Sequence, residues 1–362
     1  MSIATPLLTA PSLDRPSLLA RTRASVRERW GGAAPELVDV PTVELTVARF
    51  LAAWLDEVVR VTVRPRTIAS YGEIVRLHLV PGLGELALTR MTPADVQTFL
   101  NAKSASGLAP RTVAYLRGVL RGALGYAERT GLVDRNVARL ARPPRIPHRT
   151  VSPLTIDEAR TFLAVIGGDR LEALYLVAIG VGLRQGEILG LRWSDVDLVG
   201  GSLTVRHALA RINGRLVLDE PKSATSRRNV PLPAFVQEAL VAHRARQLKE
   251  RSRLGWASGS AEFVDLVFTT TVGTPLDGIS VTRRFQRIIA AAGLPRQRFH
   301  DLRHACASLL LAQGVPARVV METLGHYEIS LTLNTYSHVL PSLGREAADR
   351  MDAVLGAQPS VG

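Results

Sequence analysis

Apolar residues recur at helical spacing along the chain from about residue 43 onward. In Val47–Val58 they fall three and four positions apart, which indicates an amphipathic helix. Three more helices are predicted from their boundary residues: one from Pro65 to Pro81-Gly82, one after the N-cap Thr92, and one from Pro110 to Gly131. Four helices in about 90 residues predict a compact helical domain over residues 43–141, preceded by an irregular basic segment over residues 1–42.

A basic, proline-rich stretch separates this region from the rest of the chain. Residues 142–149 show no helical period, so we expect residues 142–153 to be an extended linker. Helical periodicity returns at Thr155–Val165, and short β signals appear at Ser202–His207, Arg215–Leu218 and Asn229–Leu232. The pattern predicts a mainly α second domain with a small antiparallel β-sheet over residues 154–341, then a C-terminal helix and tail over residues 342–362.

Positive charge is concentrated in the first predicted domain. The chain has a net charge of +13 and a pI of about 10.9. Between Pro41 and Thr150, 16 lysines and arginines stand against 8 acidic residues, an excess of +8. A solvated helix face is the ordinary explanation of such charge, but an excess dominated by arginine favours contact with DNA phosphates. Arg66 and Arg111, each just inside a predicted helix, are the candidates for DNA contacts.

Several classes of protein are disfavoured. No stretch approaches the roughly 20 consecutive apolar residues that span a bilayer, and the N-terminus lacks the apolar core of a secretory signal. Cys306 is the single cysteine, so neither an intramolecular disulfide nor a cysteine metal cluster is expected. No clustered carboxylates accompany the histidines, which disfavours a metal nuclease. We therefore expect a reduced, cytoplasmic protein with no membrane partner, metal or cofactor.

Two segments of the second domain carry basic residues at turns. In GLRQGE, an apolar helix ends at Gly182, Arg184 occupies the turn, and a new helix is expected to begin at Glu187. Taken alone, Arg184 is more simply a cation at a helix C-terminus. In PKSATSRRN, Lys222 stands in a polar turn between two strand-like segments, where a hairpin tip would deliver one amine into a groove. A solubilising loop lysine is the more frequent case.

Two further segments combine histidine with arginine or tyrosine. FHDLRH opens a long helix in which His300 and Arg303, three residues apart, share a face. His304 is expected on a different face as a packing or capping residue, and Asp301 as a first-turn acid that suits the helix dipole. In LGHYEISLTLNTYSH, His326 follows a glycine turn and Tyr336 lies ten residues further on. A lone tyrosine is most often a half-buried core residue.

Together these residue types suit phosphoryl transfer. A phosphodiester under attack gains charge on its non-bridging oxygens, and fixed donors that stabilise this charge are each worth about 10²–10³ in rate. A tyrosine phenol can serve as the nucleophile, and a lysine can protonate the departing alkoxide.

The four segments, in this order, resemble the catalytic boxes of tyrosine recombinases of the phage integrase family, and the resemblance covers residues 43 to about 355. The helical region, with its Pro81-Gly-Leu-Gly and Pro110-Arg-Thr-Val segments, resembles the SAM-like core-binding domain of that family. The resemblance implies that Arg184, Arg303 and His326 hold the scissile phosphate. It also implies that Lys222 is the general acid, that His300 assists proton transfer, and that Tyr336 forms a covalent 3′-phosphotyrosine.

The family resemblance also implies partners. These are double-stranded DNA attachment sites, a homotetramer on synapsed DNA, and an accessory DNA-bending or directionality factor, at the nucleoid of a bacterium or phage host. Residues 1–42 lack the length and alternation of the small arm-binding sheet domain of many integrases, which puts arm-site binding in doubt. The amphipathic segment 345–355 would pack on its own domain or, as in the family, on a neighbouring protomer.

The resemblance favours integration and excision of a mobile element. Xer-like resolution of chromosome or plasmid dimers uses the same chemistry, and type IB topoisomerases use similar chemistry as monomers without sequence preference. A non-catalytic DNA-binding or architectural protein is the alternative from another class, and it predicts that Tyr336→Phe leaves function intact.

Overall fold

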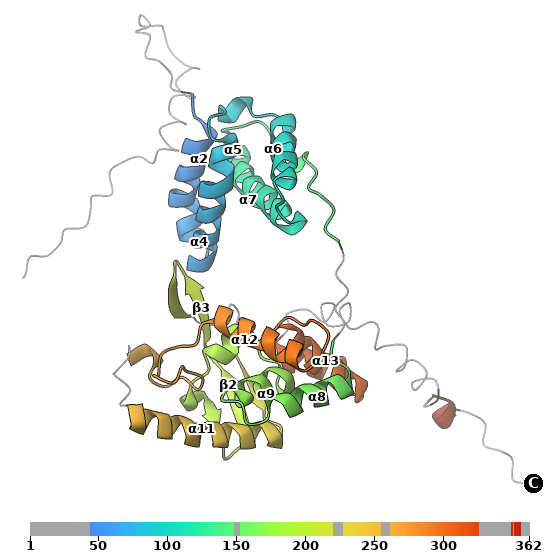
Figure 1. Cartoon of the computed structure of the whole chain (residues 1–362). Helices are drawn as coiled ribbons and strands as arrows, with labels where there is room; N and C mark the ends of the chain where they lie inside the picture. The colour runs from blue at the N-terminus through green and yellow to red at the C-terminus, as the bar shows by residue number, and fades with distance from the viewer. Residues whose placement is uncertain are drawn as a thin grey trace, which may run out of the picture. The chain divides into compact units, whose positions relative to one another are not determined.

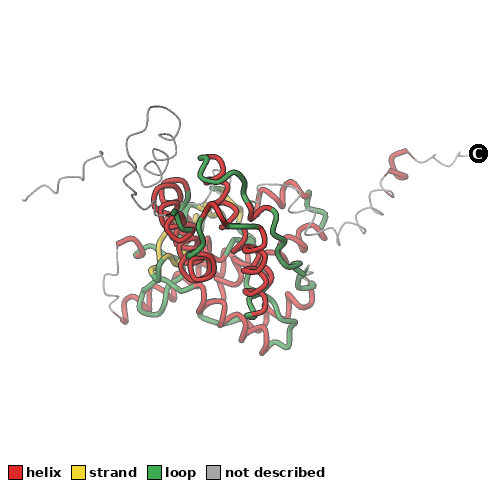
Figure 2. Tube along the Cα trace, turned by 90° about the horizontal axis from the view of Figure 1, so that it is seen from above, coloured by secondary structure: helices red, strands yellow, loops and turns green. Residues whose placement is uncertain are grey.

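The computed structural model describes residues 44–147, 153–219, 227–254, 261–325, 349 and 351–355. The chain folds into two compact units, Met1–His148 and Arg149–Gly362, which we describe separately as unit 1 and unit 2 (Figure 1). Helix dominates the described residues, and the strands all belong to unit 2 (Figure 2). None of the helices within the described ranges is long and apolar enough to cross a bilayer.

Over residues 44–147, unit 1 is built from four long helical segments. The first segment consists of α2 (Val47–Trp54), the π-helical turn η2 (Leu55–Val59) and α3 (Arg60–Thr62). The second consists of α4 (Pro65–Ile74), the π-helical turn η3 (Val75–Leu79) and α5 (Val80–Leu83). The third and fourth are α6 (Pro93–Ala105) and α7 (Pro110–Arg129). Two short 3₁₀ turns, η4 (Leu88–Arg90) and η5 (Val137–Arg139), connect or follow them. The four predicted helices are confirmed, and Phe50, Leu51, Leu116 and Leu120 are fully buried at their centre.

Capping residues decide where helices begin in both units. Thr92 Oγ1 accepts a hydrogen bond from the Asp95 amide at 3.2 Å, while the Thr92 amide donates to the Asp95 carboxylate at 2.8 Å. Thr155 and Glu158 repeat the same reciprocal pair at the start of α8 (Ile156–Ile166). Such a capping box satisfies amides that the first helical turn leaves without a backbone partner, which is why the predicted N-cap at Thr92 is confirmed.

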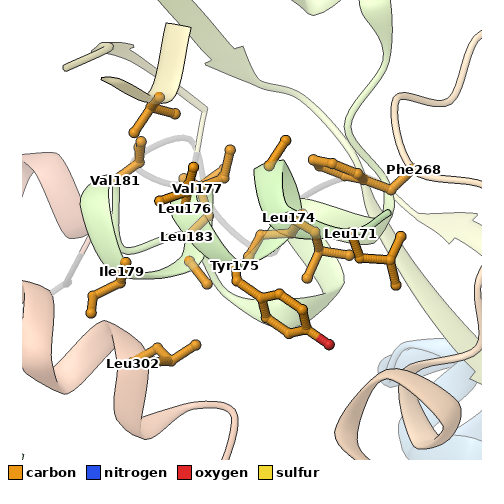
Figure 3. Close-up of a cluster of buried hydrophobic side chains, with 14 of the residues drawn as sticks. Leu171, Leu174, Tyr175, Leu176, Val177, Ile179, Val181, Leu183, Phe268 and Leu302 are labelled. Atoms are coloured by element: carbon orange, nitrogen blue, oxygen red, sulfur yellow. The ribbon is translucent and has the colours of Figure 1, made fainter. Parts of the chain in front are cut away.

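The core of unit 2 surrounds α9 (Glu172–Gly180). Every residue from Ala173 to Ile179 is buried, as expected of a helix that is apolar on all sides. Figure 3 shows Leu174, Tyr175 and Val177 projecting from this helix among neighbouring apolar side chains, with Leu302 of another helix nearby. Among its described residues, unit 2 also contains the helices α10 (Gln185–Leu189), α11 (Ala234–Leu254), α12 (Gly278–Ala291), α13 (Asp301–Ala312) and α14 (Ala317–Leu324), with short 3₁₀ turns η6 (Trp193–Asp195) and η8 (Ala261–Phe263).

The described part of unit 2 contains two small antiparallel sheets. One has the order β1 (Val196–Asp197), β2 (Ser202–Val205), β5 (Arg228–Pro231), and the other pairs β3 (Ala208–Ile212) with β4 (Arg215–Asp219). The second is a hairpin closed by Asn213 and Gly214, whose φ angles of 49° and 78° suit a two-residue turn that needs positive φ at both positions.

The predicted small antiparallel sheet is present, but the hairpin expected around Lys222 is wrong. β4 pairs with β3, whereas β5 pairs with β2, so the strands on either side of Lys222 belong to different sheets. The tight Asn213-Gly214 turn gives β4 a local partner, which leaves β5 to complete the other sheet. The sequence pattern missed β1 and β3 because β1 is two residues long and β3 alternates only weakly.

Removal of an aromatic ring from the unit 2 core should show its contribution directly. Phe162 is fully buried, with its ring edge-on to Tyr175 at 6.0 Å and to Phe285 at 5.8 Å between centroids. We expect Phe162→Ala to lower the free energy of unfolding by about 3–5 kcal/mol because it removes apolar burial and leaves a cavity. Urea unfolding of the full chain measures it. Val165→Ala, at a half-exposed position of the same helix, should change stability by less than about 1 kcal/mol, and equal losses would contradict the packing.

Candidate active site

Arg184 occupies the turn between α9 and α10. Gly182, with φ 71°, reverses the chain after α9, and Arg184 is the N-cap of α10. The arginine side chain has no hydrogen-bond acceptor with which to cap a helix. Instead, the Glu187 carboxylate accepts a hydrogen bond from the Arg184 amide at 3.0 Å. The guanidinium donates from Nη1 to Glu187 at 2.7 Å and from Nη2 to the Gly325 carbonyl at 2.9 Å. The side chain stays 40% exposed, so its head is held in place and remains accessible.

Arg303 approaches the same turn from α13. It is 2% exposed, and its Nη1 donates to the Gly182 carbonyl at 2.7 Å. A side chain at Gly182 would place Cβ 2.5 Å from the Leu324 side chain and 3.1 Å from Cys306 Sγ, so both the positive φ and the space require glycine. The structure thus brings the two arginines expected to hold phosphate to one turn of the backbone.

His300 stands immediately before α13, and its ring lies 5.1 Å from that of His304, edge to face. The expectation that His304 lies on a different face is wrong, because residues four apart on a helix are neighbours. The pKa of His300 is lowered to about 4, first by desolvation on its protein side and then by repulsion from His304 and Arg303. The outer side of His300 remains exposed to solvent. At neutral pH the ring is therefore uncharged.

The first turn of α13 is anchored by Asp301, a predicted first-turn acid that the structure places there. Its carboxylate accepts from the Arg298 amide at 2.8 Å and from Arg298 Nη2 at 2.7 Å. Burial alone raises the pKa of Asp301, but the hydrogen bonds and charge of Arg298 outweigh it and the net pKa is lowered. The ionised carboxylate holds the turn from which His300 and Arg303 both project.

Glu187 is a site residue to which the sequence analysis assigned no role. Its side chain is 5% exposed and pairs with Arg184 at 2.7 Å and with Arg228 at 3.0 Å. Burial opposes its charge, yet Arg228 and then Arg184 lower its pKa overall, so it is ionised. The available signal was an acid three residues after Arg184 on a short helix; Arg228, distant in sequence, could not be linked to it from the pattern.

Three predicted site residues, Lys222, His326 and Tyr336, lie outside the described residues. Their described neighbours in the chain belong to the same network. Arg228, six residues after Lys222, donates from Nε to the Thr323 carbonyl at 2.8 Å. Gly325, immediately before His326, ends α14 in the left-handed conformation and accepts from Arg184.

Arg66 and Arg111 both lie in unit 1, and both are exposed. The two helices that carry them open with the same Pro-Arg-Thr sequence. Ser70 and Tyr115, each five residues after its helix's first proline, are 3.0 Å apart through their hydroxyls. The helices therefore meet in the second turn of each, so the two arginines belong to neighbouring helix starts.

Within the described ranges, no three of the His, Cys, Asp or Glu side chains are close enough together to bind a metal ion. The described end of the C-terminal segment, residues 351–355, is helical and exposed.

Comparisons with known proteins match both units. A profile described as the phage integrase family matches residues 154–342, more than half of the chain, and one described as the phage integrase N-terminal SAM-like domain matches residues 46–104. A XerC-like tyrosine recombinase of Caldanaerobacter subterraneus subsp. tengcongensis is 29% identical, with 87% of this chain and 85% of the relative covered. An integrase of Saccharopolyspora erythraea is 28% identical, with 85% and 82% covered.

The fold is shared with a solved structure. The Tn1549 transposon integrase, in complex with a circular intermediate DNA, superposes with a TM-score of 0.73 at 23% identity, covering 85% of this chain and 99% of that one.

The low pKa of His300 leads to a prediction about pH. Because the ring is neutral above about pH 4, the rate of any reaction that uses it as a base should show no step from His300 between about pH 5.5 and 8. The measurement is a single-turnover pH–rate profile of the wild type and of His300→Asn, with His304→Asn as the neighbouring control. A step near pH 6.5 that disappears only in His300→Asn would contradict the lowered pKa.

Proposed function

Because the chain belongs to the phage integrase family and is a tyrosine recombinase, we propose that it integrates and excises a mobile element at short DNA attachment sites through Tyr336. The observation that carries the site assignment is the meeting of Arg184 and Arg303 at the Gly182 turn, inside the region that matches the family. Two fixed guanidiniums at one turn form a cradle for a single phosphate.

The cleavage step transfers the phosphoryl group to the protein. The Tyr336 phenol attacks the scissile phosphorus, a phosphorus–oxygen bond to tyrosine forms, and the bond to the 5′-oxygen breaks. The phenolic proton passes to the ring of His300, which is uncharged beforehand, and Lys222 donates a proton to the departing 5′-oxygen. Arg184, Arg303 and His326 stabilise the charge that develops on the non-bridging oxygens.

The joining step reverses this exchange on a different strand. A free 5′-hydroxyl attacks the phosphotyrosine and gives its proton to Lys222, and the new phosphodiester forms. The bond from phosphorus to Tyr336 breaks, and the phenol regains its proton from His300. The energy of the original phosphodiester is held in the protein link, so the reaction needs no nucleotide hydrolysis. Two duplexes contain four strands to be exchanged, and four nucleophiles are therefore required, which supports a homotetramer on synapsed DNA.

Unit 1 supplies DNA affinity in this proposal. Its excess positive charge and the exposed Arg66 and Arg111 at neighbouring helix starts suit contacts with the duplex that holds the cleavage site. An accessory DNA-bending or directionality factor would set the choice between integration and excision. Such a reaction takes place on the DNA of a bacterial cell or of a phage within it.

A second candidate is Xer-like resolution of chromosome or plasmid dimers, which is favoured by the XerC-like relative. The chemistry of the two is the same. The identity of the cleaved DNA distinguishes them, since a resolvase acts on two copies of one site within a replicon and an integrase joins two different sites.

The covalent intermediate is directly testable. We expect the full chain, incubated without metal with a nicked suicide duplex that carries its element's end sequence, to form a slow-migrating adduct on a denaturing gel. Tyr336→Phe should abolish the adduct and keep DNA binding, while Tyr327→Phe, at the other tyrosine of the segment, should retain it. A protein that binds this DNA and forms no adduct would instead be a non-catalytic DNA-binding protein.

The two pairs of arginines should separate cleavage from binding. Arg184→Ala and Arg303→Ala are each expected to slow single-turnover cleavage by about 10²–10³-fold with little change in affinity, because they act on charge formed during the reaction. Arg66→Ala and Arg111→Ala should weaken binding and reduce its dependence on salt concentration, with the cleavage rate of bound DNA retained. Mobility-shift assays across salt concentrations and adduct formation at saturating protein measure both. Equal losses of binding and cleavage in all four would show that they are ordinary phosphate anchors.

A further inference from the structure

Arg228 is a buried arginine at the start of β5, paired in register with Val205 of β2. Its side chain is 8% exposed, and arginine is seldom buried to this degree unless its charge is paired. It donates from Nη2 to Glu187 Oε2 at 3.0 Å and from Nε to the Thr323 carbonyl at 2.8 Å. One side chain therefore joins a strand, the helix that follows Arg184, and the last turn of α14.

The Glu187 carboxylate is divided between two guanidiniums. Oε1 accepts from Arg184 Nη1 at 2.7 Å and, at the longer distance of 3.5 Å, from Arg228 Nη1. Oε2 accepts from Arg228 Nη2 and from the Arg184 amide, each at 3.0 Å. Carboxylate and guanidinium prefer to pair through two parallel hydrogen bonds. Because Oε2 already accepts from Arg228 Nη2 and from the Arg184 amide, the Arg184 head makes one hydrogen bond to the carboxylate and its Nη2 donates to the Gly325 carbonyl. The shared carboxylate also leaves the trio with a net charge of +1.

The last turn of α14 is held from the same side. Arg228 donates a hydrogen bond to the Thr323 carbonyl and Arg184 donates one to the Gly325 carbonyl, at a helix end where cations are favoured. A Cβ at Gly325 would lie 2.9 Å from Arg228 Nη1, so the turn and the guanidinium are in close contact. His326 follows this turn directly in the chain, and Lys222 precedes Arg228 by six residues.

We propose that Arg228 is a positioning residue of the recombinase. By sharing the Glu187 carboxylate with Arg184 and donating to the carbonyl of Thr323, it sets the Arg184 head and the turn before His326 relative to the strand that follows the Lys222 segment. Its hydrogen bonds to Glu187 and to the Thr323 carbonyl involve no group that is assigned to the reaction. The inference rests on the proposed function, because Arg184, Lys222 and His326 are assigned to the reaction there. Its alternative is an ion pair that contributes to stability alone.

Unit 2 offers a matched control for that alternative. Arg170 pairs with Glu250 at 2.6 Å and donates to the Thr269 carbonyl at 2.8 Å, so it makes the same kinds of contact as Arg228, with none of the proposed site residues among these partners. Lysine at either position keeps the charge and cannot reproduce both sets of hydrogen bonds. Arg228→Lys and Arg170→Lys in the full chain therefore separate positioning from stability.

The experiment measures three quantities for each variant: the melting temperature, DNA affinity by mobility shift, and single-turnover adduct formation on the nicked suicide duplex. We expect both variants to melt below the wild type and to bind DNA normally. Arg228→Lys should slow adduct formation by about 10²-fold, as displacement of a reacting group by about 1 Å does, whereas Arg170→Lys should keep the wild-type rate. A wild-type rate in Arg228→Lys, or equal losses in the two variants, overturns the inference.

A double variant tests the route through Glu187. If Arg228 acts by dividing that carboxylate, Glu187→Gln combined with Arg228→Lys should be no slower than the slower single variant, because both changes disturb one unit. Losses that multiply would show that Arg228 acts independently of Glu187 and would overturn the inference. Failure of the wild type to form any adduct overturns the proposed function and this inference with it, whereas a normal wild-type adduct with a fast Arg228→Lys adduct overturns the inference alone.

Discussion

Two arginines share a single buried carboxylate in unit 2, and the arrangement of the site depends on this two-to-one ratio of positive to negative charges. Arg184 and Arg228 both pair with Glu187, whose ionised state their charges maintain against the cost of burial. A one-to-one pair would neutralise the arginine that faces solvent, and an arginine without a carboxylate would not be held. The surplus cation is what can attract a phosphate while its geometry stays fixed.

Two glycines in the left-handed conformation provide backbone carbonyls that accept hydrogen bonds from Arg303 and Arg184. Gly182 ends the turn after α9 and offers its carbonyl to Arg303, and Gly325 ends α14 and offers its carbonyl to Arg184. Each arginine is thus held in part by the turn next to another site segment. Such reciprocal contacts tie α10, α13 and α14 together, so a shift of one segment is felt by the others.

The buried helix α9 is the support for this arrangement. Because it is apolar on all sides, it has a single position in the core, with aromatic rings of α8, α12 and the start of α13 packed about Tyr175. The Gly182 turn leaves the end of this helix, and α13 packs against it. Close packing leaves such a helix little freedom to move, which gives the two arginines the rigid base that a preorganised phosphate site needs. In unit 1, by contrast, Arg66 and Arg111 are exposed at helix starts.

Local sequence determined the elements of this protein, and tertiary structure decided how their side chains are partnered. Helix starts at Thr92, Pro110 and Thr155 follow from capping residues and proline, which act within a few residues. The segments with basic residues, histidine and tyrosine indicated phosphoryl transfer. The faces of the helices were less certain, as His304 beside His300 showed. The partner of β5, the role of Glu187 and the bond from Arg303 to Gly182 depend on contacts between residues up to 121 positions apart. Periodicity contains no record of such pairs, because they form only when the core brings distant segments into contact.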